Sequence, residues 1–101
     1  MTRVLTLIEN DVERYLIKRV KAVNGLCLKF VSPGNAGVPD RLIIWPNGRV
    51  VFVELKRDAN HHPRPLQLRW HRVIRSKQVD VYVLHSKQEV DGFIKKEVVS
   101  L

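Results

Sequence analysis

The sequence has only one cysteine, Cys27, and this scarcity excludes both a disulfide framework and a cluster of thiolate metal ligands. It also has no apolar run near the roughly 20 residues that a membrane helix needs. The apolar run at residues 4–8 is interrupted by Thr6 and followed by the acidic residues Glu9 and Asp11. It is too short for the hydrophobic region of a signal peptide, and acidic residues directly after it do not fit one either. We therefore expect a soluble, cytoplasmic protein with no membrane partner.

Acidic residues are few compared with basic ones: 10 Asp and Glu stand against 18 Lys and Arg, which gives a net charge of +8. Such an excess attracts anions and favours polyanionic partners, above all nucleic acid. The apolar fraction of 45% is ordinary for a globular protein. With 101 residues in all, we expect residues 1–101 to form a single domain.

The spacing of apolar residues predicts seven elements in the order αβββαβα. Helices are expected at residues 6–23, 66–77 and 86–96, and strands at residues 26–31, 40–45, 50–56 and 79–84. A hairpin followed by a strand-helix-strand crossover implies an α/β fold with a mixed β-sheet flanked by helices. Trp70, at helical spacing, is expected in the core rather than as a base-stacking platform, whereas Trp45 fits either role.

The predicted hairpin brings two carboxylates together. A loop of three residues, 46–48, places Asp40 directly opposite Glu54, whereas a two-residue loop places Asp40 opposite Leu55 and diagonal to Glu54. Opposite residues have Cβ atoms about 4.5–5.5 Å apart, and diagonal ones lie a few Å further. Both registers therefore put the two carboxylates within reach of one divalent ion, which carboxylate oxygens bind readily.

Strand alternation adds a lysine to this pair. Glu54 and Lys56 are two residues apart on one strand and face the same way, while Val53 and Leu55 face the core. A lysine beside a metal can position and deprotonate water, or neutralise charge that builds on a phosphate. The alternative is that Glu54 and Lys56 are solvated charges and that Asp40 is an ordinary turn residue. Their combination in one hairpin favours the catalytic interpretation.

Two segments carry a family resemblance: residues 37–42, GVPDRL, and residues 51–56, VFVELK. They resemble the signature of the PD-(D/E)XK nuclease superfamily and, more narrowly, the VRR-NUC (virus-type replication-repair nuclease) family. The similarity runs from about residue 8 to residue 94 and includes residues 29–34 and 64–67. It implies a restriction-endonuclease-like core, Mg²⁺ as the cofactor with Mn²⁺ as a substitute, and hydrolysis of phosphodiester bonds in DNA.

The resemblance also implies roles for individual residues. Asp40 and Glu54 would be metal ligands, and the main-chain carbonyl of Leu55 would complete the site. Lys56 would be the catalytic lysine. Gln67 matches the family's glutamine on the helix after the motif, where it would support the site or the lysine.

A glutamate on the first helix is expected in this family, and two candidates share one helix face. Glu13 is preferred because it lies near the middle of the helix, and Glu9 remains the alternative. Both are also compatible with a solvated helix face. His61 and His62 are interpreted as part of a loop that touches DNA rather than as metal ligands, since the carboxylate site needs no histidine.

Several polar residues are candidates for contact with DNA phosphates. They are Lys29, Ser32, Arg57, Arg64, Arg69, Arg72 and Arg75. Lys29 fits equally well as ordinary strand polarity, and some of the arginines are expected to be solvated charges.

Stand-alone members of the family resemble Holliday-junction resolvases, so we expect a homodimer that cleaves branched DNA. A bare core of this length has no separate domain for base recognition, which favours readout of backbone and shape. The alternatives are a nuclease that is nonspecific or prefers flaps, nicks or RNA, and a non-catalytic DNA-binding module that uses the +8 charge.

Overall fold

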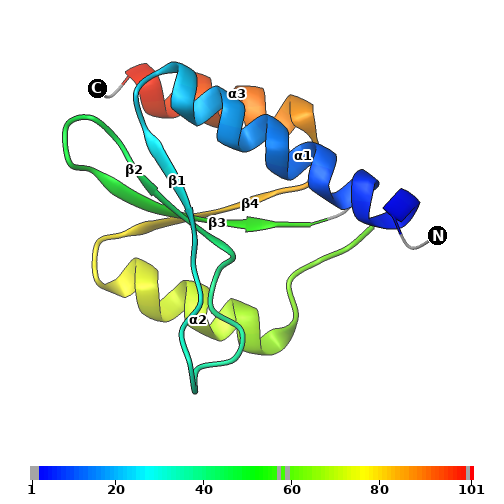
Figure 1. Cartoon of the computed structure of the whole chain (residues 1–101). Coiled ribbons are helices and arrows are strands. Elements are labelled where there is room, and N and C mark those ends of the chain that lie inside the picture. Colours follow the sequence, from blue (N-terminus) through cyan, green and yellow to red (C-terminus); the bar gives the residue numbers. More distant parts are fainter. Residues whose placement is uncertain (1–2, 57, 59, 100) are drawn as a thin grey trace.

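Seven elements follow one another in the order αβββαβα in the computed structural model (Figure 1), which confirms the predicted order. The structure describes residues 3–56, 58, 60–99 and 101, and it describes side chains from residue 11 onward. The helices are α1 (Arg3–Ala22), α2 (Pro65–Ser76) and α3 (Lys87–Val99). The strands are β1 (Leu26–Lys29), β2 (Arg41–Ile44), β3 (Val50–Leu55) and β4 (Asp80–Leu84).

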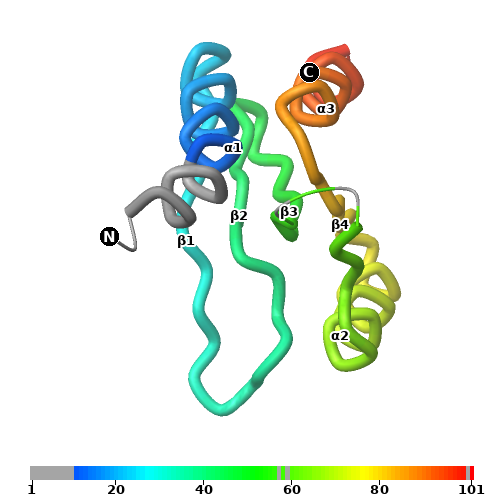
Figure 2. The backbone as a smooth tube through the Cα atoms, turned by 90° about the vertical axis from the view of Figure 1, so that its right-hand side faces the viewer, coloured from blue at the N-terminus to red at the C-terminus, as the bar shows by residue number. Residues whose placement is uncertain are grey.

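The four strands form one mixed sheet in the order β1-β2-β3-β4. β1, β2 and β3 are antiparallel neighbours, while β3 and β4 are parallel and are joined through α2. α1 and α3 lie side by side on one face of the sheet, and α2 lies on the opposite face (Figures 1 and 2). No helix in the described part of the chain is long and apolar enough to cross a membrane.

The main hydrophobic core lies between the sheet and the layer of α1 and α3. Strand alternation points Ile43, Val51 and Val53 into it, and all three are fully buried. The other buried aliphatic and aromatic members are Leu16, Val20, Trp45, Leu84, Val90, Phe93 and Ile94. Burying a side chain of this kind stabilises the fold by about 1.5–3 kcal/mol. Glu54, next to Val53, therefore points to the opposite face, which α2 covers.

Trp70 lies outside this core, so the expectation that it is a core residue is wrong. It is half-buried on α2, and its Nε1 donates a hydrogen bond to the carbonyl of Ala36 at 3.0 Å. The reason is that Trp70 lies on the face of α2 that packs against the loop between β1 and β2, whereas Gln67 and His71 lie on the face that points to the sheet.

The β2–β3 hairpin adopts the register of the three-residue loop, residues 46–48. Arg41 pairs with Val53, so the residue before the strand, Asp40, falls opposite Glu54. The first of the two predicted registers is therefore the one that the hairpin adopts.

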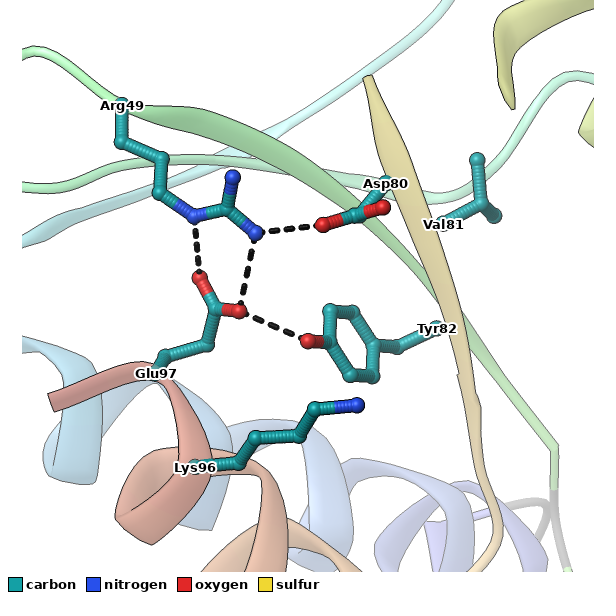
Figure 3. A pocket seen from close by; sticks show the side chains of 6 residues that line it. All are labelled: Arg49, Asp80, Val81, Tyr82, Lys96 and Glu97. Carbon is teal, nitrogen blue, oxygen red and sulfur yellow. Dashed lines mark hydrogen bonds and ion pairs between the residues drawn. The ribbon is translucent and has the colours of Figure 1, made fainter. Parts of the chain in front are cut away.

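A polar network centred on the buried carboxylate of Glu97 joins α3 to the sheet, through Arg49, Asp80 and Tyr82 (Figure 3). Glu97 is 2% exposed, and its carboxylate accepts hydrogen bonds from Trp45 Nε1 at 2.8 Å and from the Tyr82 hydroxyl at 2.6 Å. Arg49 donates to both carboxylate oxygens of Glu97, at 2.9 and 3.0 Å, and also to Asp80. One carboxylate thus ties the last helix to three points of the sheet.

Candidate active site

The carboxylates of Asp40 and Glu54 are neighbours at the open end of the β2–β3 hairpin. Directly opposite residues of antiparallel strands share a face of the sheet and have Cβ atoms about 4.5–5.5 Å apart. Glu54 is buried, whereas Asp40 is exposed. The pair therefore has one carboxylate at the floor of the site and one at its solvent-facing rim.

Glu54 is held in an unusual electrostatic state. Burial, and then the neighbouring carboxylate of Asp40, raise its pKa to about 7, and the ammonium group of Lys56 opposes this rise. One carboxylate oxygen, Oε2, accepts a hydrogen bond, while the other, Oε1, is buried with no partner among the described residues. A buried carboxylate oxygen without a donor is costly, so a cation or a proton at this atom would stabilise it.

Gln67 connects the buried carboxylate to the lysine. Its amide nitrogen donates to Glu54 Oε2 at 2.9 Å, and its amide oxygen accepts from Lys56 Nζ at 2.8 Å. The same oxygen accepts from the backbone N–H of Arg64 at 2.9 Å, which caps the start of α2. Lys56 Nζ lies 3.4 Å from Glu54 Oε2. Gln67 thus fixes the mutual position of the carboxylate and the ammonium group.

Asp40 is oriented by the backbone of β3. Its Oδ2 accepts a hydrogen bond from the N–H of Leu55 at 3.1 Å. The N–H and C=O of one strand residue point to the same edge, so the carbonyl of Leu55 also faces the side of Asp40. This is the geometry expected if that carbonyl supplements the two carboxylates.

Gly37 sets how closely the loop after β1 approaches α2. Its φ of +92° lies in the left-handed region, and a Cβ there would come within 2.9 Å of Leu66 Cγ and 3.3 Å of the Gln67 nitrogen. Gly34 has a similar φ, +81°, but a Cβ at this position would meet nothing within 4 Å. The two glycines share a positive φ and differ in packing.

This difference allows a matched experiment on the support of Gln67. Gly34→Ala should lower the free energy of unfolding by about 1 kcal/mol, the cost of placing a Cβ at positive φ. Gly37→Ala should cost about 1–3 kcal/mol more, because it also overpacks the contact with Leu66. Urea denaturation of both variants measures the two changes in unfolding free energy. Equal decreases would show that the close approach of the loop to α2 at Gly37 does not affect stability.

Glu13 does not join the two carboxylates. Its Oε1 pairs with Arg41 Nη2 at 3.1 Å, and the described residues contain no group of three His, Cys, Asp or Glu side chains that could hold a metal ion. Arg41 is buried and, by strand alternation, points to the α1 face, opposite to Asp40. The buried guanidinium needs a counter-charge, and Glu13 supplies it. The side chain of Glu9 lies outside the described residues.

Arg41 is the residue that the sequence-based interpretation missed. Arg41 directly follows Asp40 on a strand whose alternate residues are buried. Its guanidinium group therefore lies on the core face of the sheet. That pattern signals a required carboxylate partner from the packed helix.

The candidate DNA-binding residues lie in separate places. Lys29 is exposed on β1, and Arg64 and Arg69 are exposed at the start and on the surface of α2. Ser32, in the loop after β1, accepts a hydrogen bond from the side chain of Asn35 at 2.9 Å. Arg57 lies outside the described residues.

Two further arginines of α2, Arg72 and Arg75, differ in whether their side chains already have a partner. Arg75 donates to the carbonyl of Val81 at 2.6 Å, and so occupies a backbone acceptor of the edge strand β4. Arg72 is exposed and, like Arg69, has no carboxylate partner among the described residues. Arg69 and Arg72 are therefore the cations of α2 that are available to a phosphate.

The histidines of the loop after β3 contact Asp58 and His85 in the described structure. His61 Nδ1 lies 2.7 Å from Asp58, and the His61 carbonyl faces His85 Nε2 at 3.0 Å. The ring of His62 packs edge-on against that of His85. Both predicted loop histidines thus contribute to the connection between the end of β3 and the start of α3.

His71 is a second residue that the sequence did not single out. It follows Gln67 by one helical turn, is 1% exposed, and has no hydrogen-bond partner for either ring nitrogen in the described structure. Burial, and then the charges of Arg75 and Lys56, lower its pKa, which favours the neutral imidazole. Its ring therefore packs beneath the active site as an uncharged group.

Comparison with known proteins identifies the family. No protein-family profile matches the chain. A protein of Acyrthosiphon pisum secondary endosymbiont phage 1, named "Putative nuclease p44", is 43% identical over 79 residues, which are 78% of this chain and 84% of that protein. A solved structure described as "VRR_NUC domain" has a TM-score of 0.83 and 40% identity, and covers 87% of this chain and 95% of its own. The chain belongs to the VRR-NUC nuclease family.

Membership of the VRR-NUC family confirms both the resemblance and the α/β fold predicted from the sequence. A VRR-NUC fold generally implies a divalent metal cofactor, and the residues of this domain fit one. The fit rests on Glu54 Oε1, a buried oxygen without a donor, and on Asp40 directly opposite. A hard cation bound by oxygen atoms would satisfy both groups.

The raised pKa of Glu54 predicts how the metal-free VRR-NUC domain responds to pH. Below pH 4.5 Glu54 is protonated in the folded and unfolded states alike and has no effect. Between pH 4.5 and about 7 only the unfolded chain releases the proton, so stability falls as pH rises. Glu54→Gln should therefore exceed wild type in unfolding free energy by on the order of 2 kcal/mol at pH 8 in EDTA.

Urea denaturation of both proteins across this pH range measures the difference. Mg²⁺ should reduce it at pH 8, because the ion stabilises the ionised carboxylate of wild type. A difference that is independent of pH would contradict the assigned state of Glu54.

Proposed function

We propose that this VRR-NUC domain is a Mg²⁺- or Mn²⁺-dependent endonuclease that hydrolyses phosphodiester bonds in DNA. The observation that carries the proposal is the chain of hydrogen bonds from Lys56 through Gln67 to Glu54. The other oxygen of Glu54, Oε1, is buried beside Asp40 with no donor among the described residues. A lysine fixed next to two carboxylates on a shared face suits phosphoryl chemistry, in which charge must be both bound and neutralised.

Each residue has a distinct part in this proposal. Asp40, Glu54 and the carbonyl of Leu55 would hold the metal, which when bound supplies a Lewis acid for the phosphate and makes water more acidic. Lys56 has three N–H donors, of which one faces Gln67 and one faces Glu54. The remaining donor would hold the attacking water or an oxygen of the scissile phosphate. Gln67 keeps the lysine from swinging away.

DNA is the proposed substrate because of the charge of the chain. The net charge of +8 and the arginines of α2 without carboxylate partners, Arg69 and Arg72, suit a polyphosphate backbone. Contacts of this kind position a duplex without reading its sequence.

Branched DNA and a homodimer are the finer parts of the proposal. A pair of active sites is what a symmetric cut of a four-way junction requires. In support of pairing, β1 is an edge strand, and its Leu26 and Leu28 side chains are 56% and 45% exposed. An exposed apolar edge strand is suited to association with a second copy.

A panel of substrates tests the proposal. Wild-type protein is incubated with Mn²⁺ and labelled four-way junction, flap, nicked duplex, plain duplex and RNA of equal length. The proposal expects cleavage of DNA, fastest on the junction. Faster cleavage of flaps or nicks would replace the junction preference, and binding of DNA without cleavage of any substrate would favour a non-catalytic binding module.

A further inference from the structure

An apolar groove runs along α2 beside the proposed active site. It has a volume of about 300 Å³ and lies between α2 and the loop after β1, with Leu66, Trp70 and Val73 on the helix and Ala36 on the loop. These helix positions follow one another at intervals of three or four residues, so they share one face of α2. The face that contains Gln67 and His71 points to the sheet instead.

One residue that lines the groove is the chain neighbour of the active-site glutamine. Leu66 directly precedes Gln67, and a Cβ on Gly37 would touch both residues, which places the loop against the helix where Gln67 reaches the carboxylate. Leu66 and Val73 are 45% and 42% exposed. Large apolar side chains that remain exposed together beside an active site are typical of a binding surface.

The chemistry of the groove matches a nucleotide. Trp70 offers a planar ring whose orientation is fixed by the bond from Nε1 to the Ala36 carbonyl. Arg69 also lines the groove and has no carboxylate partner among the described residues, so its charge is available to a phosphate. An apolar floor with a fixed indole and a cation at its side suits a base and its phosphate together.

We propose that this groove binds one unpaired nucleobase of the DNA, stacked on Trp70, with an adjoining phosphate on Arg69. The inference rests on the proposed function for the identity of its ligand, and it adds a requirement on the substrate. The scissile strand has an unpaired or displaced base near the cut. Flaps contain unpaired bases, and bases beside a nick or a junction centre lack a stacking neighbour on one side, so they are displaced more easily than bases of an intact duplex.

Tryptophan fluorescence reports on the groove directly. The other tryptophan, Trp45, is 1% exposed and donates to Glu97, so a bound base cannot reach it. Wild-type protein in EDTA is titrated with oligothymidylate and with a fully abasic oligonucleotide of the same length and phosphate number. Oligothymidylate should quench the emission of Trp70 and bind about 5- to 100-fold more tightly than the abasic chain, the usual range for stacking one base.

A pair of leucines supplies the matched control. Leu66 and Leu68 are on the same helix and have nearly equal exposure, 45% and 44%, but only Leu66 lines the groove. Leu66→Ala should reduce the preference for oligothymidylate over the abasic chain, and Leu68→Ala should leave it unchanged. Trp70→Ala should abolish the preference. Thermal melting of each variant checks that it is folded.

Equal affinity for the two oligonucleotides, or failure of both to bind, would overturn the proposal. A change of emission that follows protein concentration rather than DNA would also overturn it, since it would place a second copy of the chain in the groove. Junction cleavage with Mn²⁺ is measured in parallel. Cleavage without any preference for oligothymidylate over the abasic chain overturns only the proposal that the groove binds a base. A base preference without cleavage supports that proposal and overturns the proposed nuclease function.

Discussion

Lys56→Ala is expected to slow cleavage of a four-way junction by about 100- to 10,000-fold, the range typical of a positioned proton-transfer group. The Lys56 ammonium group lies 3.4 Å from Glu54 Oε2 and is fixed by Gln67, so the variant removes a cation held at a defined position beside the carboxylates. Affinity for DNA should change little, because a single charge among many is removed. Single-turnover cleavage with Mn²⁺ and binding in EDTA measure the two quantities separately.

Lys77→Ala is the matched control, because Lys77 is exposed at the end of α2 and its side chain has no contact with the active site among the described residues. Its cleavage rate should equal that of wild type. Lys56→Arg keeps the positive charge but cannot give up a proton at neutral pH. Partial activity in this variant indicates charge neutralisation as the main role of Lys56, and inactivity indicates proton transfer. Full activity in Lys56→Ala would contradict the assigned role.

Glu97→Ala is expected to lower the free energy of unfolding by about 3 kcal/mol, because it leaves the buried Trp45 donor and the part-buried Tyr82 hydroxyl without their acceptor. Trp45 Nε1, the Tyr82 hydroxyl and Arg49 all donate to this one carboxylate. A loss of this size is a large fraction of the 5–15 kcal/mol that stabilises a typical domain. Urea denaturation near pH 7 measures it.

Glu89→Ala on the same helix serves as the control, since Glu89 is exposed and should cost much less. The pKa of Glu97 gives a second check. Burial alone would raise it, but hydrogen bonds from Arg49, Tyr82 and Trp45 leave it below its ordinary value. Its contribution is therefore present above the unfolded pKa of about 4.5 and is lost as pH falls below that value. Equal stability losses for the two variants would contradict the network.

The sequence was sufficient to predict the elements and the hairpin that carries the two carboxylates. Local signals decide both: apolar spacing sets the helices, and a three-residue loop fixes which residues face each other. The sequence left two loop lengths open, both of which bring the carboxylates close, and the direct pairing of Asp40 with Glu54 follows from the three-residue loop that the structure adopts. The link of Gln67 to Lys56 and Glu54 agrees with the supporting role implied by the family resemblance.

The sequence was not sufficient where distant segments meet. The partner of Glu13 depends on how α1 crosses β2, and the crossing brings Arg41 to it. The acceptor role of Glu97 depends on strands that lie 15 to 52 positions away in the chain. Helical periodicity assigned Trp70 an apolar face but could not distinguish the face against the sheet from the face against the loop.

Cleavage of a labelled four-way junction by wild type and Asp40→Asn, with Mn²⁺ and with EDTA, tests the central claim most directly. Asparagine keeps the size of Asp40 and removes the charge that a cation needs. We expect wild type to cut the junction only with Mn²⁺, and Asp40→Asn to bind the junction in EDTA as tightly as wild type without cutting it. Cleavage by Asp40→Asn at the rate of wild type, or cleavage by wild type in EDTA, would contradict the account.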